Sequence, residues 1–166
     1  MIVVVTDANI LINLSLVGRL HLFGDLRPWS FVVPEEVVAE IVDPDQRAAL
    51  LSAETQGWIA RVTIDTLPAL RLFAELRVEM GKGESACLAY AATSSCYLAS
   101  DEKKRFRRRA IELIGEERIL RTESVLLEAI RRGCLTVSEA DDCKAVLAVN
   151  RYTMPFASFS DVLRDR

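Results

Sequence analysis

Four carboxylates that lie far apart in the sequence are the residues best suited to chemistry: Asp7, Glu40, Glu84 and Asp101. Asp7 and Asp101 each follow a short apolar run, and the ends of parallel strands meet at one edge of a sheet, where ligands bind. Glu84 follows the loop MGKG at a helix start, and Glu40 lies near the end of another helix. We therefore expect the four side chains to reach one cleft.

Carboxylates that converge repel one another, and each raises its neighbours' proton affinity unless a cation lies between them. Oxygen ligands favour the hard ions Mg²⁺ and Mn²⁺, and the single histidine argues against a zinc or iron site. A divalent ion held there polarises a phosphate and activates water for phosphodiester hydrolysis. The pattern predicts a metal-dependent nuclease that needs no covalent nucleophile.

Each acid also has a purely structural interpretation. Asp7 suits the N-cap of the helix that follows it, and Asp101 suits the cap of a later, basic helix. Glu84 is favourable near the positive end of its helix. Glu40 belongs to a helix with other acidic residues, which is typical of a solvated face. The combination of the four, rather than any one of them, indicates the metal site.

The elements that must position these acids alternate between strand and helix, which predicts a three-layer α/β/α fold with a central parallel sheet. Apolar runs predict strands at 2–6, 29–33, 58–64, 96–100 and 118–121. Amphipathic spacing predicts helices at 9–26, broken near Gly18, and at 34–42, 46–55, 67–78, 84–95, 103–114, 124–132 and 138–149.

Length and composition set the broad class of the protein. A chain of 166 residues suits one well-buried domain, which we expect over residues 1–154, with a loosely attached tail at 155–166. The apolar N-terminus has no basic leader, and no uncharged stretch is long enough for a membrane span. The cysteines lack C-x-x-C spacing and are expected to be reduced thiols in a cytoplasmic protein: Cys87, Cys96, Cys134 and Cys143.

A basic segment follows Asp101 directly. Every residue from Lys103 to Arg109 except Phe106 is basic, although the net charge of the chain is −3. A phosphate backbone attracted to this segment would pass the acids. Alternatively, the segment is a solvated helix face that pairs with nearby glutamates. Because helical spacing turns only part of it toward the cleft, the candidate nucleic-acid contacts are Lys103, Lys104, Arg105 and Arg108.

The segments VVTDANILINL, VVPEEVVAEI, GKGESACLAYA and LASDEKKRFRRRA, in this order, resemble a PIN (PilT N-terminus) domain over nearly the whole chain. With ESVLLEAIRRGCL they are similar to a compact prokaryotic subgroup related to VapC-type toxins. The resemblance implies a nuclease fold in which Mg²⁺ or Mn²⁺ is bound by Asp7, Glu40, Glu84 and Asp101. It also implies that Asn9 supports Asp7 through hydrogen bonding, while Thr6 or Ser100 orients neighbouring ligands.

The same resemblance implies an endoribonuclease with an RNA substrate, a homodimer, and a small antitoxin protein as partner. The residues themselves do not distinguish RNA from DNA. Two departures are visible: Glu84 stands where many toxin relatives have Asp, and RTES at 121–124 replaces a glycine-containing turn. They leave open a PIN-like module, weak or inactive in catalysis, that binds nucleic acid or protein. A receiver-type signalling module fits less well, because Ala8 and Asn9 follow Asp7 where that module needs an acid.

Overall fold

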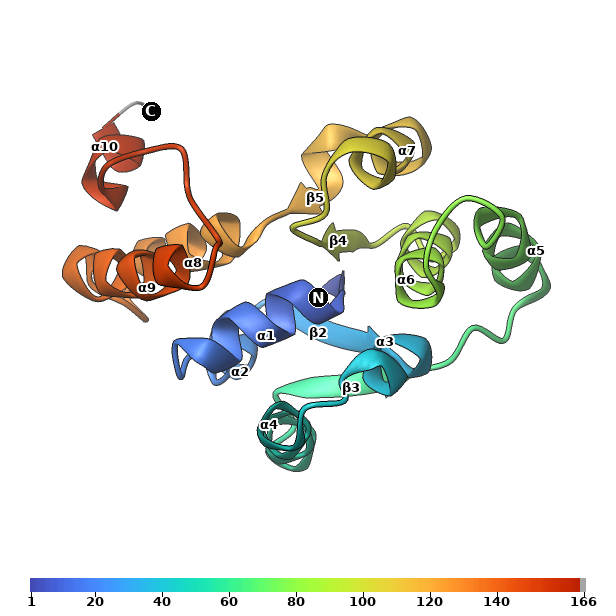
Figure 1. Cartoon of the computed structure of the whole chain (residues 1–166), viewed down its shortest axis with the longest axis horizontal. Coiled ribbons are helices and arrows are strands. Elements are labelled where there is room, and N and C mark those ends of the chain that lie inside the picture. Colours follow the sequence, from blue (N-terminus) through green and yellow to red (C-terminus); the bar gives the residue numbers. More distant parts are fainter. Residues whose placement is uncertain (165–166) are drawn as a thin grey trace.

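Five parallel strands form the centre of the computed structural model, which describes residues 1–164 (Figure 1). Their order in the sheet is β3-β2-β1-β4-β5. Their bounds are β1 (Ile2–Thr6), β2 (Trp29–Pro34), β3 (Ile59–Val62), β4 (Tyr97–Ala99) and β5 (Ile119–Leu120). Helices cover both faces of this sheet, so the three-layer α/β/α fold predicted from the sequence is confirmed.

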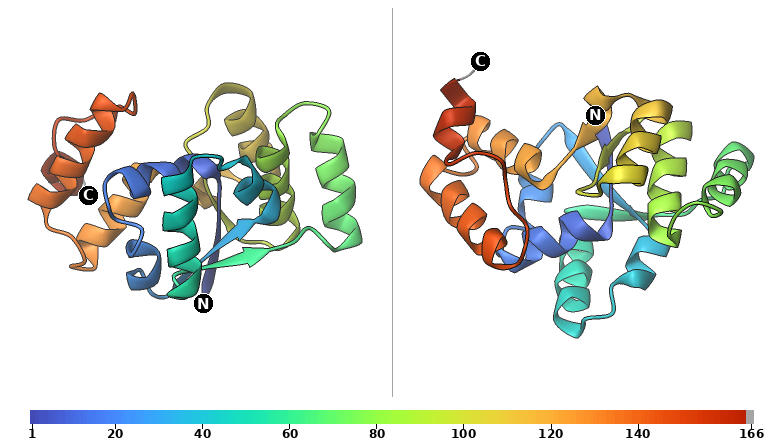
Figure 2. Two further views of the ribbon diagram at one scale, coloured as in Figure 1. Left: turned by 60° about the horizontal axis from the view of Figure 1, so that its bottom comes forward. Right: turned by 45° about the horizontal axis from the view of Figure 1, so that its top comes forward.

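The helices divide between the two faces of the sheet (Figures 1 and 2). One side carries α1 (Ala8–Leu16), α2 (Leu22–Asp25), α4 (Pro44–Thr55), α8 (Thr122–Arg131) and α9 (Val137–Val149). The other carries α5 (Leu67–Leu76), α6 (Lys82–Thr93) and α7 (Lys104–Ile114), with α3 (Glu35–Glu40) beside α6. A 3-10 turn, η1 (Glu116–Arg118), follows α7, and α10 (Phe159–Arg164) packs on α9.

Strand β1 lies in the middle of the sheet, between β2 and β4, and helices cover both of its faces. Val4 and Val5 are fully buried, as a continuous β-branched run in a parallel sheet requires. Helix α6 packs against β1 and β4 through small side chains such as Ala86 and Ala89, both fully buried. Small residues on this face allow the helix to approach the sheet closely, and the approach places the start of α6 near the carboxyl end of β1.

The strand order creates a switch point between β1 and β4. From β1 the chain crosses to β2 on one side, and it later returns to β4 on the other side. The pairing continues just past the strands, where the Asp7 N–H donates to the Ala99 carbonyl at 3.1 Å. A crevice forms at such a point in open α/β sheets, so residues directly after β1 and β4 lie at its mouth.

Three helices begin two residues earlier than the sequence predicts. Helix α4 begins at Pro44 rather than residue 46, because Asp43 caps it by accepting from the N–H groups of Asp45 and Gln46 at 3.0 and 2.9 Å. Helix α6 begins at Lys82, which puts Glu84 in its first turn rather than at its first residue. Helix α8 begins at Thr122, so the segment RTES is a helix start and not an open loop.

The described part of the C-terminal tail is packed rather than loose. Phe159, the first residue of α10, is fully buried and stacks edge-on against Phe156. Its N–H donates to Asp141 of α9 at 2.9 Å, and the Ser158 hydroxyl donates to the same carboxylate at 2.6 Å. The expectation of a loosely attached tail therefore does not hold for residues 155–164; residues 165 and 166 lie outside the described part.

Two further expectations concern cysteines and membranes. The four cysteines form no disulfide within residues 1–164, and Cys87, Cys96 and Cys143 are buried. Burial raises the pKa of the Cys87 thiol, and the nearby Asp7 and Glu40 charges raise it further, so the thiol stays protonated. Across the same described residues, no helix has both the length and the apolar character needed to cross a membrane.

Candidate active site

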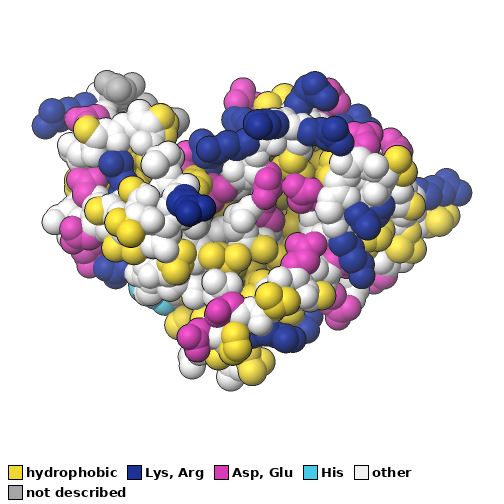
Figure 3. Space-filling view, in the orientation of Figure 1, with side chains coloured by type: hydrophobic (Ala, Val, Ile, Leu, Met, Phe, Trp, Pro, Cys, Tyr) yellow, Lys and Arg dark blue, Asp and Glu magenta, His cyan; other side chains and the backbone are white. Residues whose placement is uncertain are grey.

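A small pocket at the carboxyl edge of the sheet is lined by acidic side chains. Its volume is about 100 Å³, and four separate segments contribute its acids: Asp7, Glu40, Glu84 and Glu102. Figure 3 shows acidic side chains near the middle of this face, with lysines and arginines above them over α7. The structure thus brings three of the four predicted acids to one pocket. The fourth, Asp101, is not among its lining residues.

Asp7 lies between β1 and α1 and is only 5 % exposed. It caps α1, since its Oδ1 accepts from the Ile10 N–H at 3.3 Å, and its Oδ2 accepts from the Ser100 hydroxyl. Burial raises the pKa of Asp7 to about 7; the charges of Asp101 and Glu102 add to this, while the two hydrogen bonds oppose it. Asp7 therefore caps α1 and also lines the pocket, and it forms no ion pair with any of residues 1–164.

Glu40, the last residue of α3, reaches across to the start of α6. Its Oε1 accepts from the Gly83 N–H at 2.7 Å. A Cβ added at Gly83 would stand 2.8 Å from the carboxyl carbon of Glu40, so any larger residue would displace this carboxylate from its present position. The glycine of the GKGE segment consequently positions an acid 43 residues earlier in the chain.

Glu84 shows both of the roles considered for it. Its Oε2 accepts from the Gly81 N–H at 2.8 Å, which satisfies a free backbone donor at the start of α6. The same side chain lines the pocket. Helix capping and a role in the site are therefore compatible, because the capping bond occupies one carboxylate oxygen only.

Asp101 and Glu102 are neighbours in sequence, but their side chains bond to different residues. Asp101 is 7 % exposed and accepts hydrogen bonds from Asn13, Thr122 and Tyr152. Glu102 lines the pocket and accepts from the Asn9 amide. Glu102 therefore lines the pocket and Asp101 does not, although the Asp101 charge also raises the pKa of Asp7.

The supporting polar residues also differ in part from expectation. The Asn9 amide donates to Glu102 instead of Asp7, because it spans the edge of the sheet toward the segment after β4, while the Asp7 oxygens are held by Ile10 and Ser100. Thr6 donates its hydroxyl to the backbone carbonyl of Asp7 at 3.3 Å, not to its carboxylate. Ser100 is the one residue of the expected three that bonds to the Asp7 carboxylate.

The donor set of the pocket matches a hard divalent ion in kind. All four acids offer carboxylate oxygens, and burial together with the charges of Asp101 and Glu102 raises the pKa of Asp7, so a cation bound there would favour its ionised form. In the side-chain arrangement of residues 1–164, however, no three carboxylate, imidazole or thiol groups lie close enough to share one ion. Binding there would require the free carboxylate oxygens to come closer together than they now lie.

The basic segment divides between paired and unpaired side chains. Arg107 pairs with Glu116 at 2.7 Å, and Arg109 pairs with Glu75 and Glu112 at 3.1 and 3.2 Å. Arg105 donates to the Glu79 carbonyl at 3.1 Å. No ion pair within residues 1–164 involves the three exposed side chains of Lys103, Lys104 and Arg108. Pairing with glutamates therefore accounts for Arg107 and Arg109, and contact with nucleic acid stays a prediction for the other basic side chains.

Several residues of this region were not singled out from the sequence. Asn13 was detectable as a polar residue on the buried face of an apolar helix, and the structure bonds it to Asp101 and to Thr122. Glu102 was detectable only as a second acid beside Asp101. Tyr152 gave no signal, because it lies in an aperiodic segment and meets Asp101 only through the tertiary fold.

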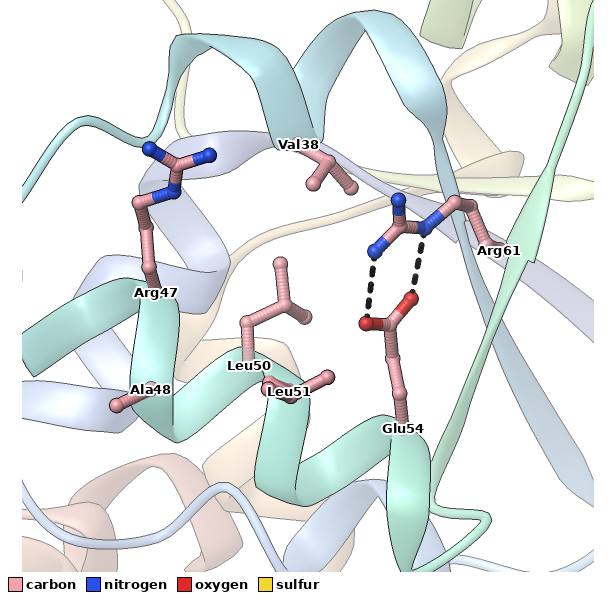
Figure 4. A pocket seen from close by; sticks show the side chains of 7 residues that line it. All are labelled: Val38, Arg47, Ala48, Leu50, Leu51, Glu54 and Arg61. Carbon is pink, nitrogen blue, oxygen red and sulfur yellow. Dashed lines mark hydrogen bonds and ion pairs between the residues drawn. The ribbon is translucent and has the colours of Figure 1, made fainter. Parts of the chain in front are cut away.

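A larger pocket of about 270 Å³ lies away from these acids, between α3, α4 and β3 (Figure 4). Arg61 of β3 donates two hydrogen bonds of 2.9 Å to Glu54 of α4 at its side. The apolar part of the pocket lining comes from Leu50, Leu51 and Val38. Glu54 is the only acid in the lining of this pocket, and it is paired with Arg61. The pocket at the carboxyl edge is lined by several acids instead.

Comparison with known proteins addresses the family of the chain. No curated protein matches the sequence. A family model described as a PIN domain matches residues 3–150, which include every strand residue except Ile2 and every acid of the pocket. Because this match covers most of the chain, the protein belongs to the PIN-domain family, a family of nuclease-type domains that generally use divalent metals.

Proposed function

We propose that this protein is a metal-dependent endoribonuclease whose Mg²⁺ or Mn²⁺ is held by the acidic pocket. The observation that carries the proposal is the meeting of Asp7, Glu40 and Glu84 at one pocket at the switch point of a PIN-domain sheet. The acids that line the pocket offer only oxygen ligands, which suit these two ions.

The carboxylates would hold the ion through oxygens that the protein leaves accessible. Glu40 and Glu84 each give one oxygen to a backbone N–H, and the second oxygen of each takes no hydrogen bond from residues 1–164. A bound divalent ion would supply phosphate polarisation and activation of water. Ser100 holds the Asp7 carboxylate in a fixed direction, and Gly83 does the same for Glu40.

The unpaired basic side chains would bind the substrate backbone. Lys103 and Lys104 follow directly after the pocket acid Glu102, and Arg108 lies one helical turn further along α7. Figure 3 shows lysines and arginines over α7, next to the acidic side chains of this face, and we call this basic area the cationic border. Such a border attracts polyanions and would guide a phosphodiester toward the acids.

The finer parts of the proposal rest on the resemblance to VapC-type toxins. They are an RNA rather than DNA substrate, a cytoplasmic location, a homodimer, and neutralisation by a small antitoxin protein. The proposal therefore includes a biological role as the toxin of a toxin-antitoxin pair.

A second candidate function is a binding module with weak or no catalysis. The observation in its favour is that no three metal-binding groups of residues 1–164 converge as the side chains now lie. A binding module would retain the cationic border and the fold while giving no turnover. The two candidates differ in one respect that is easily measured, which is product formation in the presence of a divalent ion.

The test is incubation of the purified full chain with end-labelled single-stranded RNA and DNA of the same sequence, in Mg²⁺, in Mn²⁺ and in EDTA. We expect cleavage of RNA in either metal, little cleavage of DNA, and none in EDTA. Cleavage that persists in EDTA would contradict metal dependence. RNA binding without cleavage in both metals would support the binding module, and preferential cleavage of DNA would contradict the ribonuclease assignment.

A further inference from the structure

The two consecutive acids after β4 have different surroundings, and these surroundings suggest different roles. We propose that Glu102, rather than Asp101, is the fourth carboxylate of the metal pocket, and that Asp101 is a structural anchor for the C-terminal helices. This inference rests on the proposed function, because it concerns which side chain meets the ion.

The Asp101 carboxylate is almost fully enclosed: its side chain is 4 % exposed, and Arg121 Nε lies 3.9 Å from its Oδ1. An ionised carboxylate has about four lone-pair sites. Its Oδ1 accepts from the Thr122 N–H at 2.9 Å and from the Tyr152 hydroxyl at 2.6 Å. Its Oδ2 accepts from the Asn13 amide at 2.9 Å and from the Thr122 hydroxyl at 2.5 Å. A ligand at Asp101 would have to displace one of these buried bonds.

The hydrogen-bond donors to Asp101 come from three different parts of the fold. Asn13 belongs to α1, Thr122 begins α8, and Tyr152 follows α9. Through these three, the end of β4 is tied to the helices on one face of the sheet. The Tyr152 hydroxyl also contacts Glu123, which pairs with Arg121 at 3.0 Å. The network therefore continues away from the pocket, as a structural connection would.

Glu102 has the opposite character. It lines the pocket together with Asp7, Glu40 and Glu84, and it is partly exposed. Its Oε1 accepts from the Asn9 amide, while its Oε2 takes no hydrogen bond from residues 1–164. This is the pattern already seen at Glu40 and Glu84, in which one oxygen is fixed by the protein and the other is available.

Asn9 becomes a positioning residue under this assignment. It stands two residues after Asp7 on α1 and links that helix to the segment after β4 through Glu102. Buried or part-buried partners of this kind orient metal ligands and commonly affect affinity. The polar residue of the D-x-N segment would then serve the fourth acid rather than the first.

The experiment measures Mn²⁺ binding to the full chain by electron paramagnetic resonance or calorimetry, with the melting temperature in EDTA recorded for each variant. We expect Glu102→Gln to raise the Mn²⁺ Kd by about tenfold or more, with a near-wild-type melting temperature. Asp101→Asn should lower the melting temperature by about 5 °C or more and change the Kd far less than Glu102→Gln does. Glu117→Gln, an exposed acid on η1, is the matched control and should change neither.

Tyr152→Phe removes one anchor bond only and keeps the test decisive if Asp101→Asn does not fold. It should lower the melting temperature while preserving the Kd. An unchanged Kd in Glu102→Gln, together with a weakened Kd in Asp101→Asn or Tyr152→Phe, would overturn the assignment. Asp7→Asn tests the metal pocket separately from the Glu102 assignment. Mn²⁺ binding that survives this change would contradict the metal pocket and therefore the proposed function.

Discussion

Gly83 donates its backbone N–H to Oε1 of Glu40 across 2.7 Å, and the absence of a side chain on Gly83 is what permits this contact between α6 and α3. Gly83→Ala should push the Glu40 carboxylate out of place, because the new Cβ would collide with it. We expect Mn²⁺ affinity to fall by about tenfold, with no loss of melting temperature beyond a few degrees, since alanine is the better helix former.

The partner of this experiment is a double-mutant cycle with Glu40→Gln. If Gly83 acts through Glu40, the double variant should bind Mn²⁺ no more weakly than the worse of the two single variants. Losses of affinity that add independently would show that Gly83 affects the pocket by another route.

The raised pKa of Asp7 predicts a pH-dependent stability of the metal-free protein. Because the folded state holds this proton with a pKa of about 7, above the ordinary value of 3.8, the stabilisation is complete below pH 3.8 and is lost as the pH rises through about 7. The contribution to the free energy of unfolding should change by at most about 1.4 kcal/mol per pH unit in this window. Asp7→Asn removes this pH-dependent contribution, because asparagine does not titrate.

Urea unfolding in EDTA at pH 5 and pH 8 measures this effect. The stability of Asp7→Asn relative to wild type should improve between the two pH values. Asp142→Asn, at an exposed position of α9, serves as the control and should follow the wild type. An Asp7→Asn difference that is the same at both pH values would argue against a protonated, buried Asp7.

The unpaired lysines beside the pocket predict a salt-dependent contribution to RNA binding. Lys103→Gln should weaken binding several-fold at low salt and reduce the slope of log K against log salt by about 0.7, since one phosphate contact to a single strand is lost. Arg107→Gln is the matched control, because Arg107 is already paired with Glu116. Equal effects of the two changes, measured by fluorescence anisotropy in EDTA, would contradict a directed path beside the acids.

The packed C-terminal segment predicts a large cost for truncating Phe159. This side chain is fully buried against Phe156, so Phe159→Ala should lower the free energy of unfolding by about 3 kcal/mol or more. Val149→Ala, at a residue that is 85 % exposed, should change it little. A small effect at Phe159 in chemical denaturation would indicate that α10 does not contribute to the core.

Much of the fold was predictable because its strongest signals are local. The run Ile2–Thr6 is apolar without interruption, and such a run has few alternatives to a strand buried on both faces. Asp7 follows this strand directly, so predicting the strand also predicted that Asp7 lies at the carboxyl edge of the sheet. Helix starts were less predictable, since the Asp43 cap and the early start of α8 depend on single side-chain bonds.

The side chains after β4 show where sequence reasoning reaches its limit. Asp101 and Glu102 are adjacent acids, and nothing local decides which of them faces the pocket. The decision comes from Asn13, Thr122 and Tyr152, which meet Asp101 only after three helices have packed. The tail was misjudged for a related reason, because α10 is too short for periodicity to reveal and Phe159 finds its partners on α9.

The central claim, that the acidic pocket supports metal-dependent cleavage of RNA, is tested most directly at Asp7. The measurement is the initial rate of RNA cleavage in Mn²⁺ by Asp7→Asn and by the control Asp142→Asn, each shown to be folded by its melting temperature. We predict a loss of about 100-fold or more for Asp7→Asn and a wild-type rate for the control. A folded Asp7→Asn protein that cleaves RNA at the wild-type rate would contradict the account.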